Sequence, residues 1–130
     1  MRTLIVEDEF TSRKILMKIM AAFGQCDIAV NGKEAIEAFC LAHEERRPYH
    51  VICLDILMPE MDGRETLQRI RSIEKKQGIE GLDGVKVVMI TGCSDKEEIF
   101  SAFQEGCEAY IVKPVQQEKL VQEIKKLGLV

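Results

Sequence analysis

Short apolar runs of strand length alternate along the chain with longer segments whose apolar residues recur at helical spacing. A short apolar run bounded by turn signals is typical of a buried strand, and an apolar residue every three or four positions is typical of a helix. The runs predict five strands, over residues 3–6, 27–30, 50–54, 85–91 and 109–112. The predicted helices cover residues 10–23, the stretch after Asn31, 64–77, 94–105 and 116–127. This alternation predicts a doubly wound α/β domain, a parallel sheet with helices on both faces.

The same pattern predicts where helices begin and which side faces the core. Asn31 should cap its helix together with Glu34, and Ser94 with Glu97 has the same capping-box spacing. The apolar stripes that should face inward are Ile15, Leu16, Ile19, Met20 and Phe23 in the first helix, Ala35, Ile36 and Phe39 in the second, Leu67, Ile70 and Ile73 in the third, and Leu120, Val121, Ile124 and Leu127 in the last.

Two further expectations concern the surface. The face of the third helix that carries charged residues should be solvated. Its members are Arg69, Arg71, Glu74, Lys75 and Lys76. The segment 78–84 contains three glycines and should be a mobile loop.

The composition is that of one ordinary globular domain. The chain has 130 residues, enough for a single domain over residues 1–130 with a real hydrophobic core. It is 46% hydrophobic and 31% charged, with a formal net charge of −4. No basic cluster stands out, which argues against nucleic acid as a partner, because such binding depends on Lys and Arg at phosphates.

The cysteines and the apolar segments together indicate a cytoplasmic protein. The five cysteines, at positions 26, 40, 53, 93 and 107, include no CxxC pair and should be reduced thiols, mostly packed as small hydrophobes. The spacing that a zinc site requires is absent. The first apolar run stops at Glu7, so it is no signal peptide, and no segment approaches the length of a membrane span.

Polar residues stand at the carboxyl ends of four predicted strands. Glu7 and Asp8 follow the first, Asp55 follows the third, Thr91 ends the fourth and Lys113 follows the fifth. Because these ends meet at one edge of a parallel sheet, the five side chains should converge in one crevice. Any one of them alone would most simply be a helix cap, a strand residue or a surface residue; the set is informative.

Three carboxylates and one ammonium leave this crevice with an excess of negative charge. Like charges that lie close together raise one another's pKa or attract a cation. Oxygen ligands without His or Cys suit a hard ion, and a few carboxylates with open positions suit Mg²⁺, or Mn²⁺, better than a closed calcium cage.

Four segments together resemble the response-regulator receiver domain, the CheY-like phosphoacceptor of two-component signalling. They are residues 4–9 (LIVEDE), 55–63 (DILMPEMDG), 88–92 (VMITG) and 109–115 (AYIVKPV), and the resemblance covers essentially the whole chain. It implies a (βα)5 flavodoxin-like fold, with the five parallel strands in the order 2-1-3-4-5.

The resemblance also implies a role for each residue at this edge. Asp55 would take a phosphoryl group from a histidine kinase or a histidine phosphotransfer protein, and Lys113 and Thr91 would bind the phosphoryl oxygens. Asp8, Asp55 and the backbone carbonyl of Leu57 would hold Mg²⁺, with Glu7 acting mostly through a metal-bound water. The chain would catalyse only its own phosphorylation and slow dephosphorylation, and would not otherwise be an enzyme.

The resemblance further implies a switch. When Asp55 is phosphorylated, Thr91 would turn inward and free space that Tyr110 can fill, and the surface of the fourth helix, fifth strand and fifth helix would change to bind a downstream protein that the sequence does not identify. Phe100 and Phe103 would add apolar area to that surface, although core packing is expected for at least one of them. The Lys113–Pro114 peptide would be cis.

The chain departs from the family pattern near the site. Glu7 stands where the family more often has Asp, and its longer side chain should still reach a metal-bound water. Leu57 and Cys93, two residues after Asp55 and Thr91, cannot readily orient an attacking water, so we expect slow hydrolysis of the aspartyl phosphate. Gly92 is small, which should leave the site open to a phosphodonor.

Three alternatives compete with this interpretation. An aspartate-nucleophile phosphatase of the haloacid-dehalogenase type would need a second Asp where Leu57 stands. A flavodoxin-like FMN carrier would need a Gly/Ser/Thr-rich loop where the chain has Glu7, Asp8 and Glu9. A receiver-like docking module that is never phosphorylated is disfavoured by the complete residue set. The chain stops just after the fifth helix, so a stand-alone receiver is expected if Val130 is the natural end.

Overall fold

The computed structural model describes residues 1–80, 83–92 and 95–130. Five parallel strands form one sheet in the order β2-β1-β3-β4-β5. The elements run along the chain as β1 (Arg2–Val6), α1 (Phe10–Met20), the 3₁₀ turn η1 (Ala21–Phe23), β2 (Gln25–Ala29), α2 (Gly32–Glu44), β3 (Val51–Asp55), α3 (Gly63–Lys76), β4 (Lys86–Thr91), α4 (Lys96–Gln104), β5 (Ala109–Val112) and α5 (Gln117–Lys126). The predicted fold class and strand order are confirmed.

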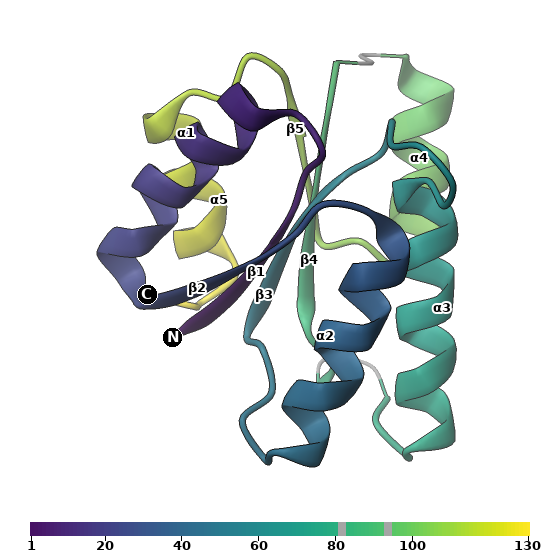
Figure 1. Ribbon diagram of the computed structural model, residues 1–130. Coiled ribbons are helices and arrows are strands. Elements are labelled where there is room, and N and C mark those ends of the chain that lie inside the picture. The colour runs from purple at the N-terminus through teal and green to yellow at the C-terminus, as the bar shows by residue number, and fades with distance from the viewer. Residues whose placement is uncertain (81–82, 93–94) are drawn as a thin grey trace.

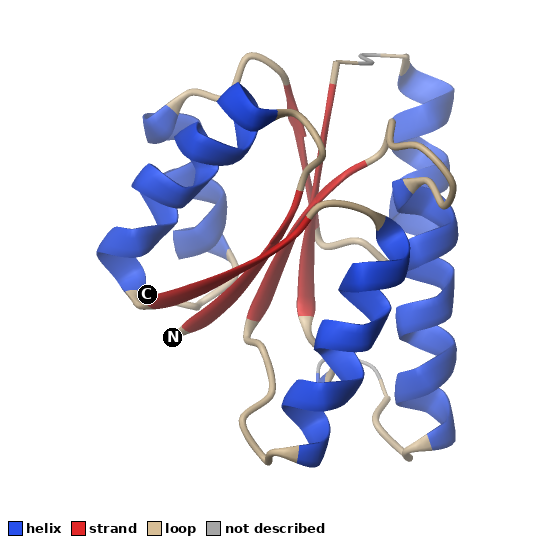
Figure 2. Ribbon diagram, in the orientation of Figure 1, coloured by secondary structure: helices blue, strands red, loops and turns tan. Residues whose placement is uncertain are grey.

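Helices cover both faces of the sheet, with α1 and α5 on one side and α2, α3 and α4 on the other (Figures 1 and 2). One core cluster lies under α2 and α3, where Phe39, Leu67 and Ile70 pack against residues such as Leu54 and Met89 of the sheet. The other lies under α1 and α5 and is built by residues such as Ile5, Leu16, Ile90, Ile111 and Leu120. Every residue of β3 is buried, as expected for the central strand of a sheet covered on both faces.

Most of the expected helix stripes face the core, with one exception in α1. Leu16, Ile19 and Met20 are buried, but Ile15 is 41% exposed, so its place in the stripe was wrong. The cap on α2 is as expected, since the Asn31 side chain accepts a hydrogen bond from the backbone N–H of Glu34. In α4 the cap is Asp95, which accepts from the backbone N–H of Glu97; Ser94 lies outside the described residues.

Two surface expectations were wrong in part, although Arg69, Lys75 and Lys76 are exposed as expected. Arg71 and Glu74 do not belong to a solvated face: Glu74 is only 4% exposed, and both side chains bind backbone groups of other segments. Phe100 and Phe103 are 64% and 45% exposed, so neither packs in the core. The loop predicted over residues 78–84 contains residues 81 and 82, which lie outside the described residues.

The described cysteines carry no disulfide: Cys53 and Cys107 are buried, and Cys26 and Cys40 are half-buried. Cys93 lies outside the described residues. In the described part of the chain, no helix combines the length and the apolar character needed to cross a membrane.

Candidate functional site

The sheet brings the polar strand ends together at one edge. Asp55 is the last residue of β3 and Thr91 the last residue of β4, and Glu7 and Lys113 directly follow β1 and β5. The strands are parallel and in register, with Val6 opposite Leu54 and Thr91 opposite Val112. Glu7, Asp55 and Thr91 are almost completely buried, whereas Asp8 is exposed to solvent.

Lys113 bridges two carboxylates in this crevice. Its Nζ lies 2.6 Å from Glu7 Oε1 and 3.5 Å from Asp55 Oδ2. The Glu7 side chain is fully buried and that of Asp55 is 5% exposed, so both interactions lie largely out of water. The Lys113–Pro114 peptide bond is cis. Through these two contacts the ammonium group of Lys113 compensates the charge of the buried carboxyl groups of Glu7 and Asp55.

The two carboxyl groups have different proton affinities. Burial raises the pKa of Asp55 to about 8, the neighbouring Glu7 adds to the rise, and Lys113 opposes it. Burial acts on Glu7 in the same direction, but its interactions with Asp55 and Lys113 outweigh burial and lower its pKa. Of the pair, Asp55 is the group that holds a proton more tightly, because Glu7 has the closer contact with the ammonium.

The three acidic residues could hold a hard metal ion. One carboxylate oxygen from each of Glu7, Asp8 and Asp55 lies within 4.8 Å of the others. The second oxygen of Glu7, Oε2, is buried without a hydrogen-bond partner among the described residues. A buried acceptor of this kind is normally satisfied, and a cation or a cation-bound water would satisfy it. The donor set is all oxygen, which fits Mg²⁺ or Mn²⁺.

The turn between β3 and α3 is packed directly against Asp55. The backbone N–H of Gly63 donates to the carbonyl of Ile56 at 2.8 Å. A Cβ atom at Gly63 would lie 2.2 Å from the backbone oxygen of Asp55, so no other residue fits there without a shift. Within this turn the Leu57 backbone hydrogen-bonds Asp55, while the Leu57 side chain is 71% exposed. The backbone of Leu57 is therefore close to the carboxyl group and its side chain leaves the rim of the site apolar.

The expected switch residues lie on the two strands at this side of the sheet. Thr91 is completely buried at the end of β4. Tyr110 is half-buried in β5 and packs against the core cluster under α2 and α3. A side chain added at Gly92 would meet no atom of the described residues within 4 Å, which fits the expected open access.

Arg13 is a residue of the site that the strand-end pattern missed. Its Nη1 donates to the backbone carbonyls of Glu7 and Asp8, at 3.3 and 3.4 Å. A cation at the end of the first turn of α1 thus binds the loop that carries two of the acidic residues. Helical spacing could have revealed Arg13 in the sequence. It lies four residues after Glu9, the residue before the helix, and therefore on the side of the helix that faces the acidic segment.

The strand order and the acidic edge define a doubly wound, flavodoxin-like α/β protein whose polar site lies at the carboxyl ends of the strands. The sequence profile of the response regulator receiver domain matches residues 3–125. The chain belongs to this family, which makes it a CheY-like receiver domain of two-component signalling rather than a classical enzyme. Membership also decides against the phosphatase and the FMN carrier as alternatives.

Curated relatives include both large kinases and small single-domain proteins. Hybrid signal transduction histidine kinase B of Dictyostelium discoideum is 36% identical over 135 residues, which cover 96% of this chain and 6% of that protein. Chemotaxis protein CheY of Thermotoga maritima is 28% identical over 129 residues, which cover 98% of this chain and 97% of that protein. The chain spans only 6–12% of the length of the histidine kinases it matches.

Solved structures of receiver domains have the same fold. A chain of the CheX-CheY-BeF3-Mg²⁺ complex from Borrelia burgdorferi matches with a TM-score of 0.84 at 26% identity, covering 98% of this chain and 88% of that one. A chain of the complex between the Saccharomyces cerevisiae phosphotransfer protein Ypd1 and the receiver domain of Ssk1 matches with a TM-score of 0.84 at 27% identity, covering 99% and 89%.

Proposed function

We propose that Asp55 accepts a phosphoryl group from a phosphohistidine, in a reaction that requires Mg²⁺ or Mn²⁺. The observation that carries this proposal is the position of Asp55, buried at the end of the central strand, with an ammonium 3.5 Å away and two further carboxylates within 4.8 Å. A nucleophile, a cation for the phosphoryl oxygens and a set of metal ligands meet there, which is what phosphoryl transfer needs.

In the proposed reaction one oxygen of the Asp55 carboxylate forms a bond to phosphorus while the phosphorus–nitrogen bond of the donor breaks. The electron pair of that bond returns to the departing imidazole, which takes up a proton. Lys113 would pair with the phosphoryl oxygens, and the buried hydroxyl of Thr91 would donate to one of them. Mg²⁺ held by Glu7, Asp8, Asp55 and the Leu57 carbonyl would neutralise the negative charge gathered on the carboxylates and the phosphoryl group.

The donor is proposed to be a sensor histidine kinase or a histidine phosphotransfer protein. Two comparisons support this: the hybrid histidine kinases among the relatives, and the complex of Ypd1 with the receiver domain of Ssk1 among the similar structures. The Borrelia complex, which contains BeF3 and Mg²⁺, supports the metal requirement. The chain would also phosphorylate itself from small acyl phosphates and lose the group slowly.

The phosphorylated chain is proposed to bind a downstream protein through α4, β5 and α5. Thr91 and Tyr110 would be the switch, since Thr91 lies on β4, next to the strand that carries Asp55, and Tyr110 lies on β5, which belongs to this surface. To take the active state from ~1% to ~99% needs about 5.5 kcal/mol of differential interaction. The new bonds to Lys113, Thr91 and the metal, together with the repacked Tyr110, are the contacts proposed to supply it.

The proposal is tested by binding beryllofluoride, a mimic of the phosphoryl group, and following backbone amides by NMR. With Mg²⁺ present, we expect shifts at Asp55, Thr91 and Lys113 that extend into α4 and β5, and no shifts in the Asp55→Asn variant. Shifts that are absent, or that persist in Asp55→Asn, would contradict phosphoryl binding at Asp55. Shifts confined to the crevice would contradict the proposed switch surface but would leave phosphoryl binding at Asp55 supported.

A further inference from the structure

The contact between α3 and α4 is a row of charged and polar side chains. On α3, Arg64, Gln68 and Arg71 are four and three residues apart and therefore share one face of the helix. Arg64 Nη1 lies 3.0 Å from Glu98 Oε2, Arg64 Nε lies 3.0 Å from Glu105 Oε1, and a second guanidinium nitrogen also binds Glu105. Gln68 Nε2 donates to the other oxygen of Glu105 at 3.2 Å.

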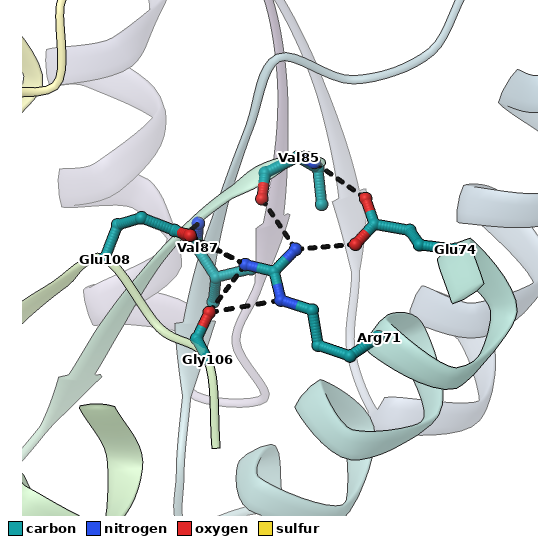
Figure 3. Close-up of polar contacts among 6 residues, drawn as sticks. All are labelled: Arg71, Glu74, Val85, Val87, Gly106 and Glu108. Carbon is teal, nitrogen blue, oxygen red and sulfur yellow. Dashed lines mark hydrogen bonds and ion pairs between the residues drawn. The ribbon is translucent and has the colours of Figure 1, made fainter. Parts of the chain in front are cut away.

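Arg71, the last of these three residues, binds the segment that follows α4 and makes no hydrogen bond to the helix itself among the contacts described. Its guanidinium donates to the carbonyl of Gly106, just after the helix, and to the carboxylate of Glu108 (Figure 3). The same guanidinium binds the Val85 carbonyl and Glu74 (Figure 3). The residues that follow α4 are thus tied to α3 and, through Glu108 and the backbone N–H of Val87, to β4. Arg64 binds Glu98 in the first turn of the helix and Glu105 just after its end.

In this arrangement the two phenylalanines of α4 face solvent, while Ile99 is half-buried. Ala102 is the one buried residue of the helix, and Phe100 and Phe103 are 64% and 45% exposed. A short amphipathic helix normally packs its large apolar residues inward. In α4 the pairing of Glu98 and Glu105 with Arg64 opposes that tendency.

A rotation of α4 about its own axis by one residue position would turn the glutamates away from α3 and bring Phe103 toward the core. Glu98 and Glu105 now bind Arg64 of α3, and Ala102 packs in the core cluster under α2 and α3. A rotation of about 100°, the angle between successive residues of a helix, would bring Ile99, Phe103 and Gly106 to those places. That position would need a small outward movement of α4, because phenylalanine is larger than alanine, and it would separate both glutamates from Arg64.

We propose that Arg64 sets the rotational position of α4 and so keeps Phe100 and Phe103 presented at the surface. Arg64 directly follows Gly63, whose backbone packs against the backbone of Asp55. The residue proposed to orient α4 is therefore next in sequence to a residue that borders the acidic crevice. The proposal rests on the side-chain contacts of α4 and does not require that Asp55 be phosphorylated.

The test measures solvent exposure at each phenylalanine by ¹⁹F NMR. The chain is labelled with 4-fluorophenylalanine, which reports five positions, and a neutral gadolinium chelate is added to relax exposed labels. Phe39, fully buried, and Phe10, 62% exposed, are the internal references. In the wild type we expect Phe100 and Phe103 to relax nearly as Phe10 does. In Arg64→Glu the relaxation of Phe103 should fall at least twofold toward that of Phe39.

Three variants control the experiment. Arg69→Glu makes the same charge change at an exposed position of α3 and should leave all five signals unchanged. The double variant Arg64→Glu/Glu105→Arg restores an ion pair and should restore the wild-type relaxation. Arg64→Gln removes the positive charge without adding repulsion, and it should also lower the relaxation of Phe103. Unchanged relaxation of Phe103 in both Arg64→Glu and Arg64→Gln would overturn the proposal. Increased relaxation of Phe39 would also overturn it, because Arg64 would then support the fold as a whole.

Discussion

Asp55 combines deep burial with an immediate positive neighbour. Burial raises its pKa to about 8, and the ammonium of Lys113 limits the rise. A carboxyl group in this position ionises more readily when more positive charge is placed beside it. The proposed nucleophile and the proposed cation site are therefore linked, because a metal bound by Glu7, Asp8 and Asp55 would favour the ionised carboxylate that the proposed reaction requires.

The lifetime of the proposed phosphoaspartate should depend on Leu57. Its side chain is 71% exposed at the rim of the crevice and offers no hydrogen bond to a water. Leu57→Asn would supply one, and a neutral hydrogen bond of about 1 kcal/mol corresponds to about a fivefold faster hydrolysis. The decay of the phosphorylated mass after removal of the donor measures this rate.

Leu57→Met is the matched control, since it keeps an apolar side chain of similar size at the same exposed position. Its decay rate should equal that of the wild type. An unchanged or longer lifetime in Leu57→Asn would show that water orientation at this position does not limit hydrolysis.

At the scale of elements, Arg71 connects α3, the start of β4 and the segment before β5. Its guanidinium binds the carbonyls of Val85 and Gly106 and the carboxylates of Glu74 and Glu108 (Figure 3). Glu74 Oε2 in turn accepts from the backbone N–H of Val85 at 2.7 Å. The network joins the elements at the edge of the sheet opposite Asp55, and it uses side chains to satisfy backbone groups where strand pairing begins.

Arg71→Ala should destabilise the fold strongly. Glu74, 4% exposed, would lose its ion pair, and the carbonyls of Val85 and Gly106 would lose their donor. Removing one partner of a buried pair costs roughly 3 kcal/mol, which a urea titration would show as a lower midpoint. Arg69→Ala, at an exposed position of the same helix, should change the free energy of unfolding by less than about 0.5 kcal/mol. Equal midpoints for the two variants would refute this role of Arg71.

Helix α3 shows what the sequence reveals about an element and what it does not. Leu67 and Ile70 were correctly predicted to face the core, because periodicity records which side of a helix is apolar. Arg71 and Glu74 were wrongly assigned to solvent. Their partners are backbone groups 11 to 35 residues away, and only the tertiary structure brings these together. For the same reason the pattern of α4 did not show that both Phe100 and Phe103 would be exposed, because the proposed cause, Arg64, lies on another helix.

At the scale of the molecule, binding of Mg²⁺ should stabilise the fold. The proposed ligands come from the β1–α1 segment and from the end of β3, and the unfolded chain does not hold them together. At a Mg²⁺ concentration of 100 times Kd, the gain is about 2.7 kcal/mol. We expect a melting temperature several degrees higher, reversed by EDTA. The same experiment on Asp8→Asn should show little gain, and on Glu9→Gln the full gain. A melting temperature that does not respond to Mg²⁺ in the wild type would contradict the metal site.

The site was more predictable than the details around it. Glu7, Asp8, Asp55, Thr91 and Lys113 stand at strand ends in the sequence, and a parallel sheet places such ends at one edge, so their convergence followed from the order of elements. The distances could not be predicted in the same way. That Lys113 lies closer to Glu7 than to Asp55, and that Gly63 touches the backbone of Asp55, depends on how the loops pack.

The most direct test of phosphorylation at Asp55 is the intact mass of the chain after incubation with acetyl phosphate and Mg²⁺. We expect a gain of about 80 Da, one phosphoryl group on the Asp55 carboxylate, that is lost when EDTA replaces Mg²⁺ and is absent in Asp55→Asn. An unchanged wild-type mass, or an adduct that persists in Asp55→Asn, would contradict the claim that Asp55 is the phosphoacceptor and would favour a docking module that is never phosphorylated.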